Sequence, residues 1–192
     1  MSPSTRLGPW TPSTPEERLD RLESLALIQQ LPARYARAVD SRDIDTLVEL
    51  FVPDVRVGPD TSGREAMRAW FVEALSRMRM TVHFVGQHVV DFHDADNATG
   101  TVYCQDELDW PDRGTFDLGK LQYRDRYVRL DGEWYFRYRR YHRVYIVDAL
   151  ERPAHGRLDG DIDGLSIHGL PDADESWGRF WAEVGVDPYP AG

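Results

Sequence analysis

The sequence predicts an α+β fold, with helices in the first part of the chain and an antiparallel sheet in the second. Apolar residues recur at helical spacing as far as Arg79, and long stretches rich in β-forming residues follow. Asp131-Gly132, between the last two of these stretches, is a strong hairpin signal. Because helices and strands are segregated, we expect helices packed on one face of a meandering sheet rather than βαβ units.

The length of 192 residues fits one domain with two tails. Residues 1–13 are rich in Ser, Thr and Pro and predict a flexible or surface-draped arm, in which Trp10 is the exception. Residues 14–147 form the expected domain. Residues 148–192 form an extension that either caps the domain or packs on a neighbouring subunit.

The first helix is expected to begin at a capping box. Thr14 supplies the N-cap, Pro15 the first-turn proline and Glu17 the capping-box glutamate. Apolar residues then recur at helical spacing, namely Leu19, Leu22, Leu25 and Ile28. Pro32 lacks a backbone donor and should kink or restart this helix, which ends at Asp40.

Two shorter helices should follow. Asp43 caps the first of them and Pro53 ends it; its apolar residues are Ile44, Leu47, Val48 and Phe51. Val55 and Val57 predict a short strand that ends in the Gly- and Pro-containing turn 58–63. The apolar face of the third helix comprises Met67, Trp70, Phe71, Ala74, Leu75 and Met78.

Four strands are expected after the helices, at Thr81–Phe92, Ala98–Asp109, Asp117–Leu130 and Glu133–Val147. Helices lying on a curved sheet can leave a cone-shaped cavity. The extension is rich in Gly and Asp as far as three aromatic residues, Trp177, Phe180 and Trp181, which could anchor a short terminal helix.

The composition argues against several classes of partner. The net charge of −10 repels phosphate backbones and anionic lipid surfaces, so neither nucleic acid nor a membrane is expected. Cys104 is the single cysteine and cannot form an intramolecular disulfide. The sequence starts without a secretory signal and contains no long apolar run, so we expect a cytoplasmic protein.

Asp40 is the first candidate for chemistry, because it follows apolar residues at the end of the first helix. A partly buried carboxylate that meets a histidine fixes the tautomer of the imidazole and raises its basicity, which makes a proton-abstracting pair. The alternative is that Asp40 caps the helix or forms a salt bridge with Arg37 or Arg42.

His83 is the second candidate. Strand alternation places His83, Val85, Gln87 and Val89 on one face and His88 on the other. A histidine among β-formers can also be a core residue that is bonded to the backbone. The spacing of five among the histidines at 83, 88 and 93 places consecutive members on opposite faces, so we expect no shared metal site.

Three phrases of the sequence together resemble a SnoaL-like domain of the nuclear-transport-factor-2-like superfamily. They are residues 35–51 around Asp40, Thr81 to Gln87, and Asp131-Gly132-Glu133-Trp134 before Arg139. The resemblance covers residues 20 to 147. It implies a conical barrel, in which a strongly curved, mixed and mainly antiparallel sheet wraps around about three N-terminal helices.

Within this superfamily the chain resembles the branch that holds scytalone dehydratase, bile-acid 7α-dehydratase and hexachlorocyclohexane dehydrochlorinase. Asp40 and His83 match the histidine–aspartate dyad of that branch. The resemblance also implies site roles for Tyr35, Asp106 and Arg139. Arg139 could exchange roles with Arg140 if a bulge shifts the register. The expected substrate-binding residues are Trp70, Phe84, Val85, Gln87, Tyr103, Tyr123 and Tyr141.

The leading hypothesis is a lyase of the dehydratase type that needs neither a metal nor an organic cofactor. His83 would remove a proton beside a carbonyl group of a small apolar ring compound, polyketide- or steroid-like. A hydroxyl would then leave as water, with Tyr35 or Arg139 assisting. The alternatives are a proton-transfer isomerase with the same dyad and a non-catalytic binding or assembly module. The family also implies a homodimer or homotrimer through the open sheet face, which Tyr127, Tyr135 and Tyr138 would suit.

Overall fold

The computed structural model describes residues 7–149, 160–162 and 165–167 and the single positions 179, 182 and 185. In this part of the chain, the helices α1 (Pro15–Asp40), α2 (Ile44–Glu49) and α3 (Arg64–Ser76) come first. The long strands β1 (Met80–Phe92), β2 (Asn97–Trp110), β3 (Thr115–Leu130) and β4 (Glu133–Asp148) follow. Two short strands of the extension, β5 (Gly160–Ile162) and β6 (Leu165–Ile167), pair as a separate two-stranded antiparallel sheet. The predicted α+β fold is confirmed.

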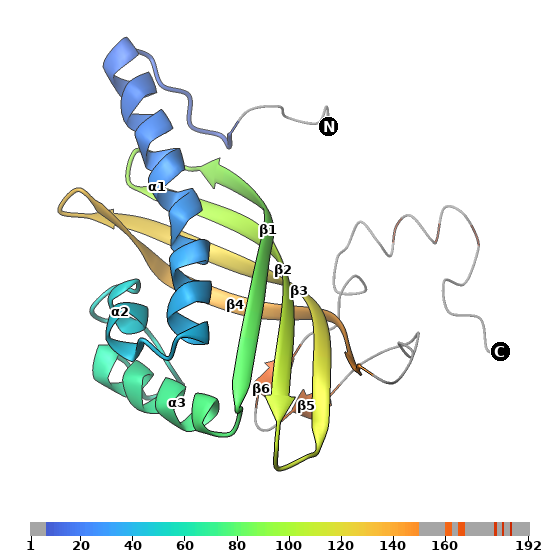
Figure 1. The fold of residues 1–192 in the computed structure, drawn as a ribbon. Coiled ribbons are helices and arrows are strands. Elements are labelled where there is room, and N and C mark those ends of the chain that lie inside the picture. Colours follow the sequence, from blue (N-terminus) through green and yellow to red (C-terminus); the bar gives the residue numbers. More distant parts are fainter. Residues whose placement is uncertain are drawn as a thin grey trace.

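The four long strands form one antiparallel sheet in the order β1-β2-β3-β4. The sheet curves around α1, and α2 and α3 lie on the same side of it (Figure 1). A parallel bridge joins Phe51, just after α2, to Phe136 of β4. Because β1 and β4 do not pair with each other, the sheet wraps the helices without closing into a barrel.

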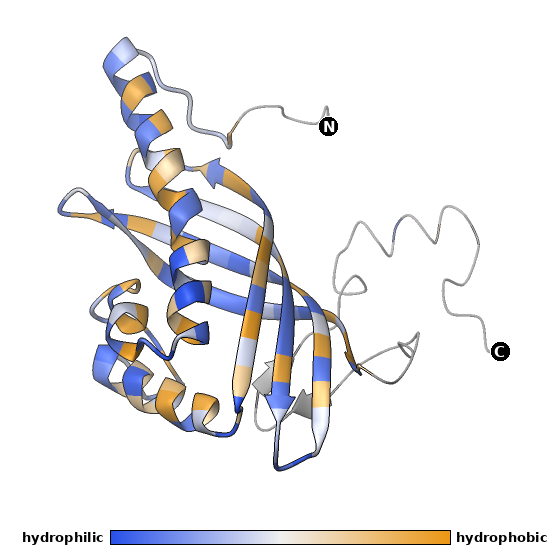
Figure 2. Cartoon of the chain, viewed as in Figure 1, coloured by the Kyte–Doolittle hydropathy of each residue, from blue (hydrophilic) through white to orange (hydrophobic). Residues whose placement is uncertain are grey.

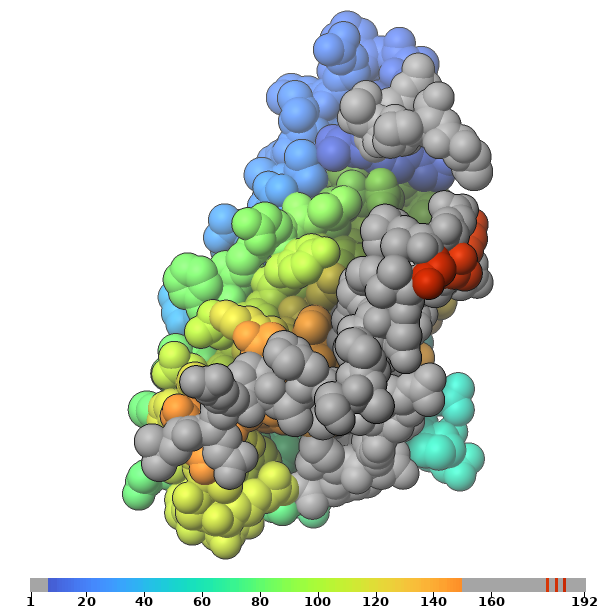
Figure 3. Space-filling model, turned by 90° about the vertical axis from the view of Figure 1, so that its right-hand side faces the viewer, coloured from blue at the N-terminus to red at the C-terminus, as the bar shows by residue number. Residues whose placement is uncertain are grey.

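α1 begins as its sequence predicts. Thr14 and Glu17 form the reciprocal capping box, and Pro15 occupies the first turn. The helix runs on through Pro32 to Asp40 as one element, so it does not restart. Its N-terminal part projects beyond the sheet (Figures 1 and 3), which leaves Leu19 and Leu22 exposed.

Residues of the N-terminal arm lie against the end of β1. The backbone of Phe92 exchanges hydrogen bonds with Leu7 and Trp10, and the Trp10 and Phe92 rings pack at a centroid distance of 6.2 Å. Arg21 of α1 donates to the carbonyl oxygens of Leu7 and Trp10. The described part of the arm is therefore draped on the domain, with Trp10 as its anchor.

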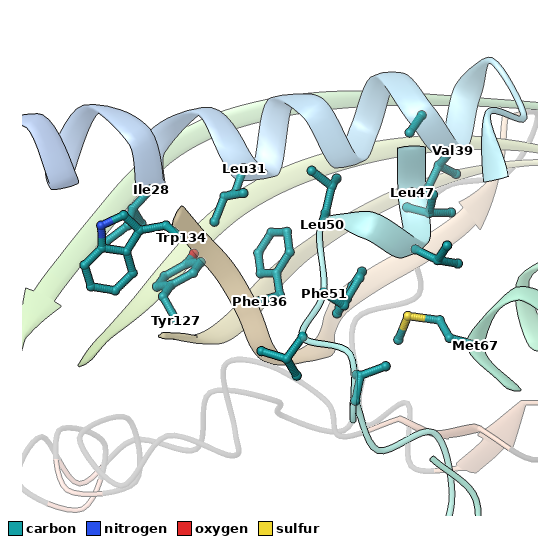
Figure 4. Packing of buried hydrophobic residues seen from close by; sticks show 14 of the residues in the cluster. Ile28, Leu31, Val39, Leu47, Leu50, Phe51, Met67, Tyr127, Trp134 and Phe136 are labelled. Atoms are coloured by element: carbon teal, nitrogen blue, oxygen red, sulfur yellow. The ribbon is translucent and has the colours of Figure 1, made fainter. Parts of the chain in front are cut away.

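The main core lies between the helices and the inner face of the sheet, the face that α1 covers. Figure 4 shows the α1 residues Ile28, Leu31 and Val39 on one side and the β4 residues Trp134 and Phe136 on the other. The rings of Phe51 and Phe136 pack at 5.1 Å between centroids. Hydrophobic and hydrophilic residues alternate along the strands (Figure 2), as expected for a sheet with one covered face.

The prediction of a short strand at Val55 to Val57 is wrong, since no strand lies among the described residues between α2 and α3. An isolated bridge joins Arg56 to Ser62 instead, and the Arg56 side chain donates to the carbonyl oxygens of Gly58 and Pro59 within the turn. Of the helix predicted around Trp177, Phe180 and Trp181, these three residues lie outside the described part, and the described positions Arg179 and Ala182 are helical. None of the described helices combines the length and the apolar character needed to cross a bilayer.

Candidate active site

Asp40 and His83 meet where the C-terminal end of α1 crosses β1. Nδ1 of His83 lies 2.7 Å from Oδ1 of Asp40, and the backbone N–H of His83 donates to Oδ2 at 2.8 Å. One carboxylate thus binds both the ring and the backbone of the histidine. The contact predicted between the two side chains is present, and their catalytic role stays a prediction.

Thr81, which the sequence reasoning missed, and Arg42, which it named only as a possible salt-bridge partner, hold the carboxylate in place. The hydroxyl of Thr81 donates to Oδ1 of Asp40 at 2.9 Å, and Arg42 donates to the same hydroxyl at 2.7 Å. Arg42 follows the C-cap of α1 with a φ of 60°, and its guanidinium reaches Thr81 of β1 and the carbonyl oxygen of Met78. Thr81 could have been found from its parity with His83, because both point inward from β1.

The electrostatic environment keeps Asp40 ionised. Burial acts to raise its pKa, but hydrogen bonds from the His83 ring and backbone, the charge of His83 and a hydrogen bond from Thr81 together lower it. An ionised Asp40 holds the proton of the neutral imidazole on Nδ1, so Nε2 is the nitrogen free to accept a proton. The negative end of the α1 dipole also favours the imidazolium that would form.

Asp106 lies directly opposite His83 on β2 and is buried. Burial raises its pKa to about 6, against the lowering effect of the His83 charge. Its Oδ1 has no hydrogen-bond partner among the described contacts, and a Cβ built on Gly119 would lie 1.8 Å from that oxygen. Gly119 therefore provides the space for a carboxyl group that is partly protonated near neutral pH.

We expect Asp106→Asn to stabilise the domain at alkaline pH. The folded protein keeps a proton up to a pKa of about 6, whereas the unfolded chain releases it near the ordinary value of 3.8. Ionisation therefore costs stability as pH rises, by about 3 kcal/mol above pH ~7. Urea unfolding of wild type and variant from acid to alkaline pH measures this difference.

The gap between Asp106→Asn and wild type should close as the pH falls toward about 4, where the unfolded carboxyl also binds its proton. Asp60→Asn, at an exposed turn position, is the matched control. Its free energy of unfolding should differ from that of wild type by an amount that does not change with pH. Parallel stability curves for wild type and Asp106→Asn would contradict the assignment.

Tyr35 packs beside the dyad, and Arg139 packs on Tyr35. The rings of Tyr35 and His83 meet edge to face at 6.4 Å, and the Arg139 guanidinium lies 4.4 Å from the Tyr35 ring and 4.1 Å from the Tyr123 ring. Burial raises the pKa of Tyr35 to about 12, although Arg139 acts to lower it. The five predicted catalytic residues thus form one contiguous inner site, defined here as Asp40, His83, Tyr35, Asp106 and Arg139.

Arg139 itself is held by a carboxylate that the sequence reasoning did not single out. Nε and Nη2 of Arg139 donate to the two oxygens of Asp125 at 3.0 and 2.7 Å, and both side chains are buried. Tyr127 also donates to Asp125 at 2.8 Å and meets Nε2 of His88 at 3.0 Å. Asp125 faces Arg139 in the register of β3 and β4, which only the pairing of the strands reveals.

A bulge in β1 corrects several of the predicted orientations. The register shifts between Val85 and His88, so His88 points inward like His83, while Gln87 and Val89 are exposed. The argument that a spacing of five separates His83 and His88 was therefore wrong. Among the described residues, no three potential ligands are nevertheless grouped as a metal site.

The predicted substrate-binding residues divide between the two faces of the sheet. Val85, Tyr123 and Tyr141 pack together on the inner face, in a cluster with Val102, Cys104 and Leu121. Phe84 is 74% exposed and Tyr103 48% exposed, because both alternate with inward-facing residues. Gln87 is also exposed, and Trp70 of α3 is exposed beside Phe71. Phe84, Gln87 and Tyr103 therefore do not point into the inner site, and a role for them in substrate binding stays a prediction.

The predicted tyrosines of an oligomer interface are also split. Tyr127 is buried on the inner face and Tyr135 packs against the main core, whereas Tyr138 is exposed on the outer face. A hollow of about 610 Å³ opens on this outer face, and none of the inner-site residues lines it.

The sequence and the fold were compared with those of known proteins. Residues 20–140 match the sequence profile of the SnoaL-like domain. A protein of Novosphingobium aromaticivorans proposed to be a scytalone dehydratase is 23% identical, with a TM-score of 0.61 over 73% of this chain and 98% of that chain.

Two further solved structures share the architecture. A hexachlorocyclohexane dehydrochlorinase of Novosphingobium barchaimii is 23% identical, with a TM-score of 0.62 over 80% of this chain and 99% of that chain. A protein of unknown function from Mycobacterium tuberculosis is 25% identical, with a TM-score of 0.56 over 68% and 76% of the two chains. Similarity at this level describes the fold.

Proposed function

The chain belongs to the SnoaL-like domain family, and on that premise we propose that it is a cofactor-independent lyase of the dehydratase type. The observation that carries the proposal is the 2.7 Å contact between Nδ1 of His83 and Asp40, inside a site lined by aromatic and aliphatic side chains. Two of the similar structures are named for eliminations, one a dehydratase and the other a dehydrochlorinase.

His83 would act as the general base. Its Nε2 takes a proton from a carbon next to a carbonyl group, and Asp40 stabilises the imidazolium that results. The C–O bond then breaks, and the leaving hydroxyl takes a proton to become water. Asp106 is best suited to supply that proton, because it lies opposite His83 and has a pKa of about 6.

Tyr35 and Arg139 would shape the site rather than transfer the proton. The pKa of Tyr35, about 12, makes it a poor acid, and the Arg139 guanidinium is committed to Asp125 and to three aromatic rings. Tyr123 and Tyr141 offer flat apolar contacts beside the dyad. This environment supports a small, carbonyl-bearing ring compound, polyketide- or steroid-like, as the substrate.

Turnover of a panel of β-hydroxycarbonyl ring compounds in D₂O, followed by mass spectrometry, tests this function. A lyase gives a product lighter by one water, whereas an isomerase with the same base gives a product that keeps all its heavy atoms and gains deuterium at carbon. His83→Gln is the matched control, because glutamine is of similar length but cannot act as the base. Binding without turnover or deuterium exchange across the panel would favour the non-catalytic module instead.

Assembly of the chain as a homodimer or homotrimer in the cytoplasm remains a prediction. It does not depend on the chemistry of the dyad.

A further inference from the structure

The outer face of the sheet carries a hollow rich in arginine. Residues of all four long strands line its volume of about 610 Å³, among them Arg124 and Arg126 of β3 and Tyr138 and Arg140 of β4. The register pairs Arg124 with Arg140 and Arg126 with Tyr138, so these side chains alternate with the inward-facing Asp125 and Arg139. The hollow and the inner site are thus on opposite faces of one sheet.

The charge of this hollow is opposite to that of the whole chain. Two carboxylates of the described residues line it: Asp125, which belongs to the inner ion pair with Arg139, and Asp91. Arg137 at the rim pairs with Asp54. A basic surface in a protein of net charge −10 therefore calls for an acidic occupant.

His142 is a buried residue of the outer face. It pairs with Gln122 in the register and points outward, yet it is 6% exposed. α1, α2 and α3 all lie on the other side of the sheet (Figure 1). None of these three helices therefore covers His142.

We propose that the acidic C-terminal extension, residues 150–192 of the same chain, binds across this outer hollow. The extension contains nine Asp and Glu against three Arg, so it carries −6 of the net charge of −10. Its acids gather in two groups, at 159–163 and 172–175. The occupant is thus a peptide of matching charge that the chain itself supplies.

The connection of the chain permits this arrangement. β4 passes along the hollow at His142 and ends at Asp148, about 20 Å further on for a strand. The β6 segment of the extension already lies against β4. A tethered segment binds at a high effective concentration, so modest ionic contacts suffice.

A second copy of the sheet is a poorer occupant. An isologous interface through this hollow would set one arginine-lined surface against the same surface of a second copy, and like charges repel. The acidic extension avoids this repulsion between like charges. If it occupies the hollow, the predicted oligomer has to use another surface.

Hydrogen–deuterium exchange of the full chain tests the proposal. In wild type the amides of residues 150–192 should be protected, and Arg126→Glu/Arg140→Glu should speed their exchange by about tenfold or more. Arg18→Glu/Arg34→Glu, on exposed positions of α1, changes the net charge equally and should leave the protection intact. Amides of β2 and β3 in the same spectra report whether the sheet remains folded.

Salt provides a test that requires no variant. About 1 M sodium chloride shortens the screening length to about 3 Å and should also speed exchange in the extension of the wild type. The proposal would be overturned if the amides of the extension were unprotected in wild type. It would also be overturned if neither salt nor charge reversal reduced their protection. Protection that grows with protein concentration would assign the hollow to a second copy instead.

Discussion

Asp125→Ala is expected to destabilise the domain by about 3–5 kcal/mol, which would be a large part of the 5–15 kcal/mol typical of a folded domain. The side chain of Asp125 is 0% exposed and that of Arg139 5% exposed. Removal of the carboxylate would leave a buried guanidinium that always carries its charge, together with the Tyr127 hydroxyl that now donates to Asp125. Chemical denaturation by urea, followed by circular dichroism, measures the loss.

Asp45→Ala is the matched control for this prediction. Asp45 forms a salt bridge with Arg68 at 2.5 Å, but its side chain is exposed. Solvent-exposed pairs contribute about 0–1 kcal/mol, so the control should unfold nearly as wild type does. Equal effects of Asp45→Ala and Asp125→Ala would show that the inner ion pair is not the buried anchor that its geometry implies.

Simultaneous replacement of both partners separates the cost of an unpaired charge from the value of the pair. Asp125→Leu/Arg139→Met fills the same space with apolar atoms and leaves no buried charge. We expect this double variant to be markedly more stable than Asp125→Ala. A double variant as unstable as the single one would mean that the three rings around Arg139 require its cation.

The segregation of helices and strands could be predicted from the sequence because each signal is local. The capping box at Thr14 and the hairpin at Asp131-Gly132 depend on a few neighbouring residues, and both are present. The contact of Asp40 with His83 is not local, and the resemblance to the SnoaL-like family indicated it. Spacing within either segment could not have paired them.

The errors arose where pairing between strands overrides alternation within a strand. One extra residue near Gln87 turns His88 inward and Gln87 outward. No residue type in this segment predicts the bulge. The Asp125–Arg139 pair was missed for a related reason. Both residues lie in charged stretches that suggest solvent-exposed faces, and only the register of β3 with β4 shows that they are buried together.

Asp40→Asn is expected to lower kcat by about 10²–10⁴-fold while changing KM little, because it changes which nitrogen of His83 carries the proton. The backbone N–H of His83 can only donate, so the side-chain oxygen of an asparagine must occupy the place of Oδ2. The amide nitrogen then faces Nδ1 of His83 and donates to it. The ring proton moves to Nε2, which can no longer act as a base.

Kinetics of the single and double variants distinguish this tautomer effect from a loss of structure. If Asp40 acts only through His83, Asp40→Asn/His83→Gln should be no slower than His83→Gln alone, because the two residues work as a unit. Unfolding in urea should show Asp40→Asn to be folded, since the amide keeps the bond from the His83 backbone. His83 can accept a proton at Nε2 only while Asp40 holds the ring proton on Nδ1. An Asp40→Asn variant that retains more than about a tenth of the wild-type kcat would therefore remove the basis for the general-base assignment.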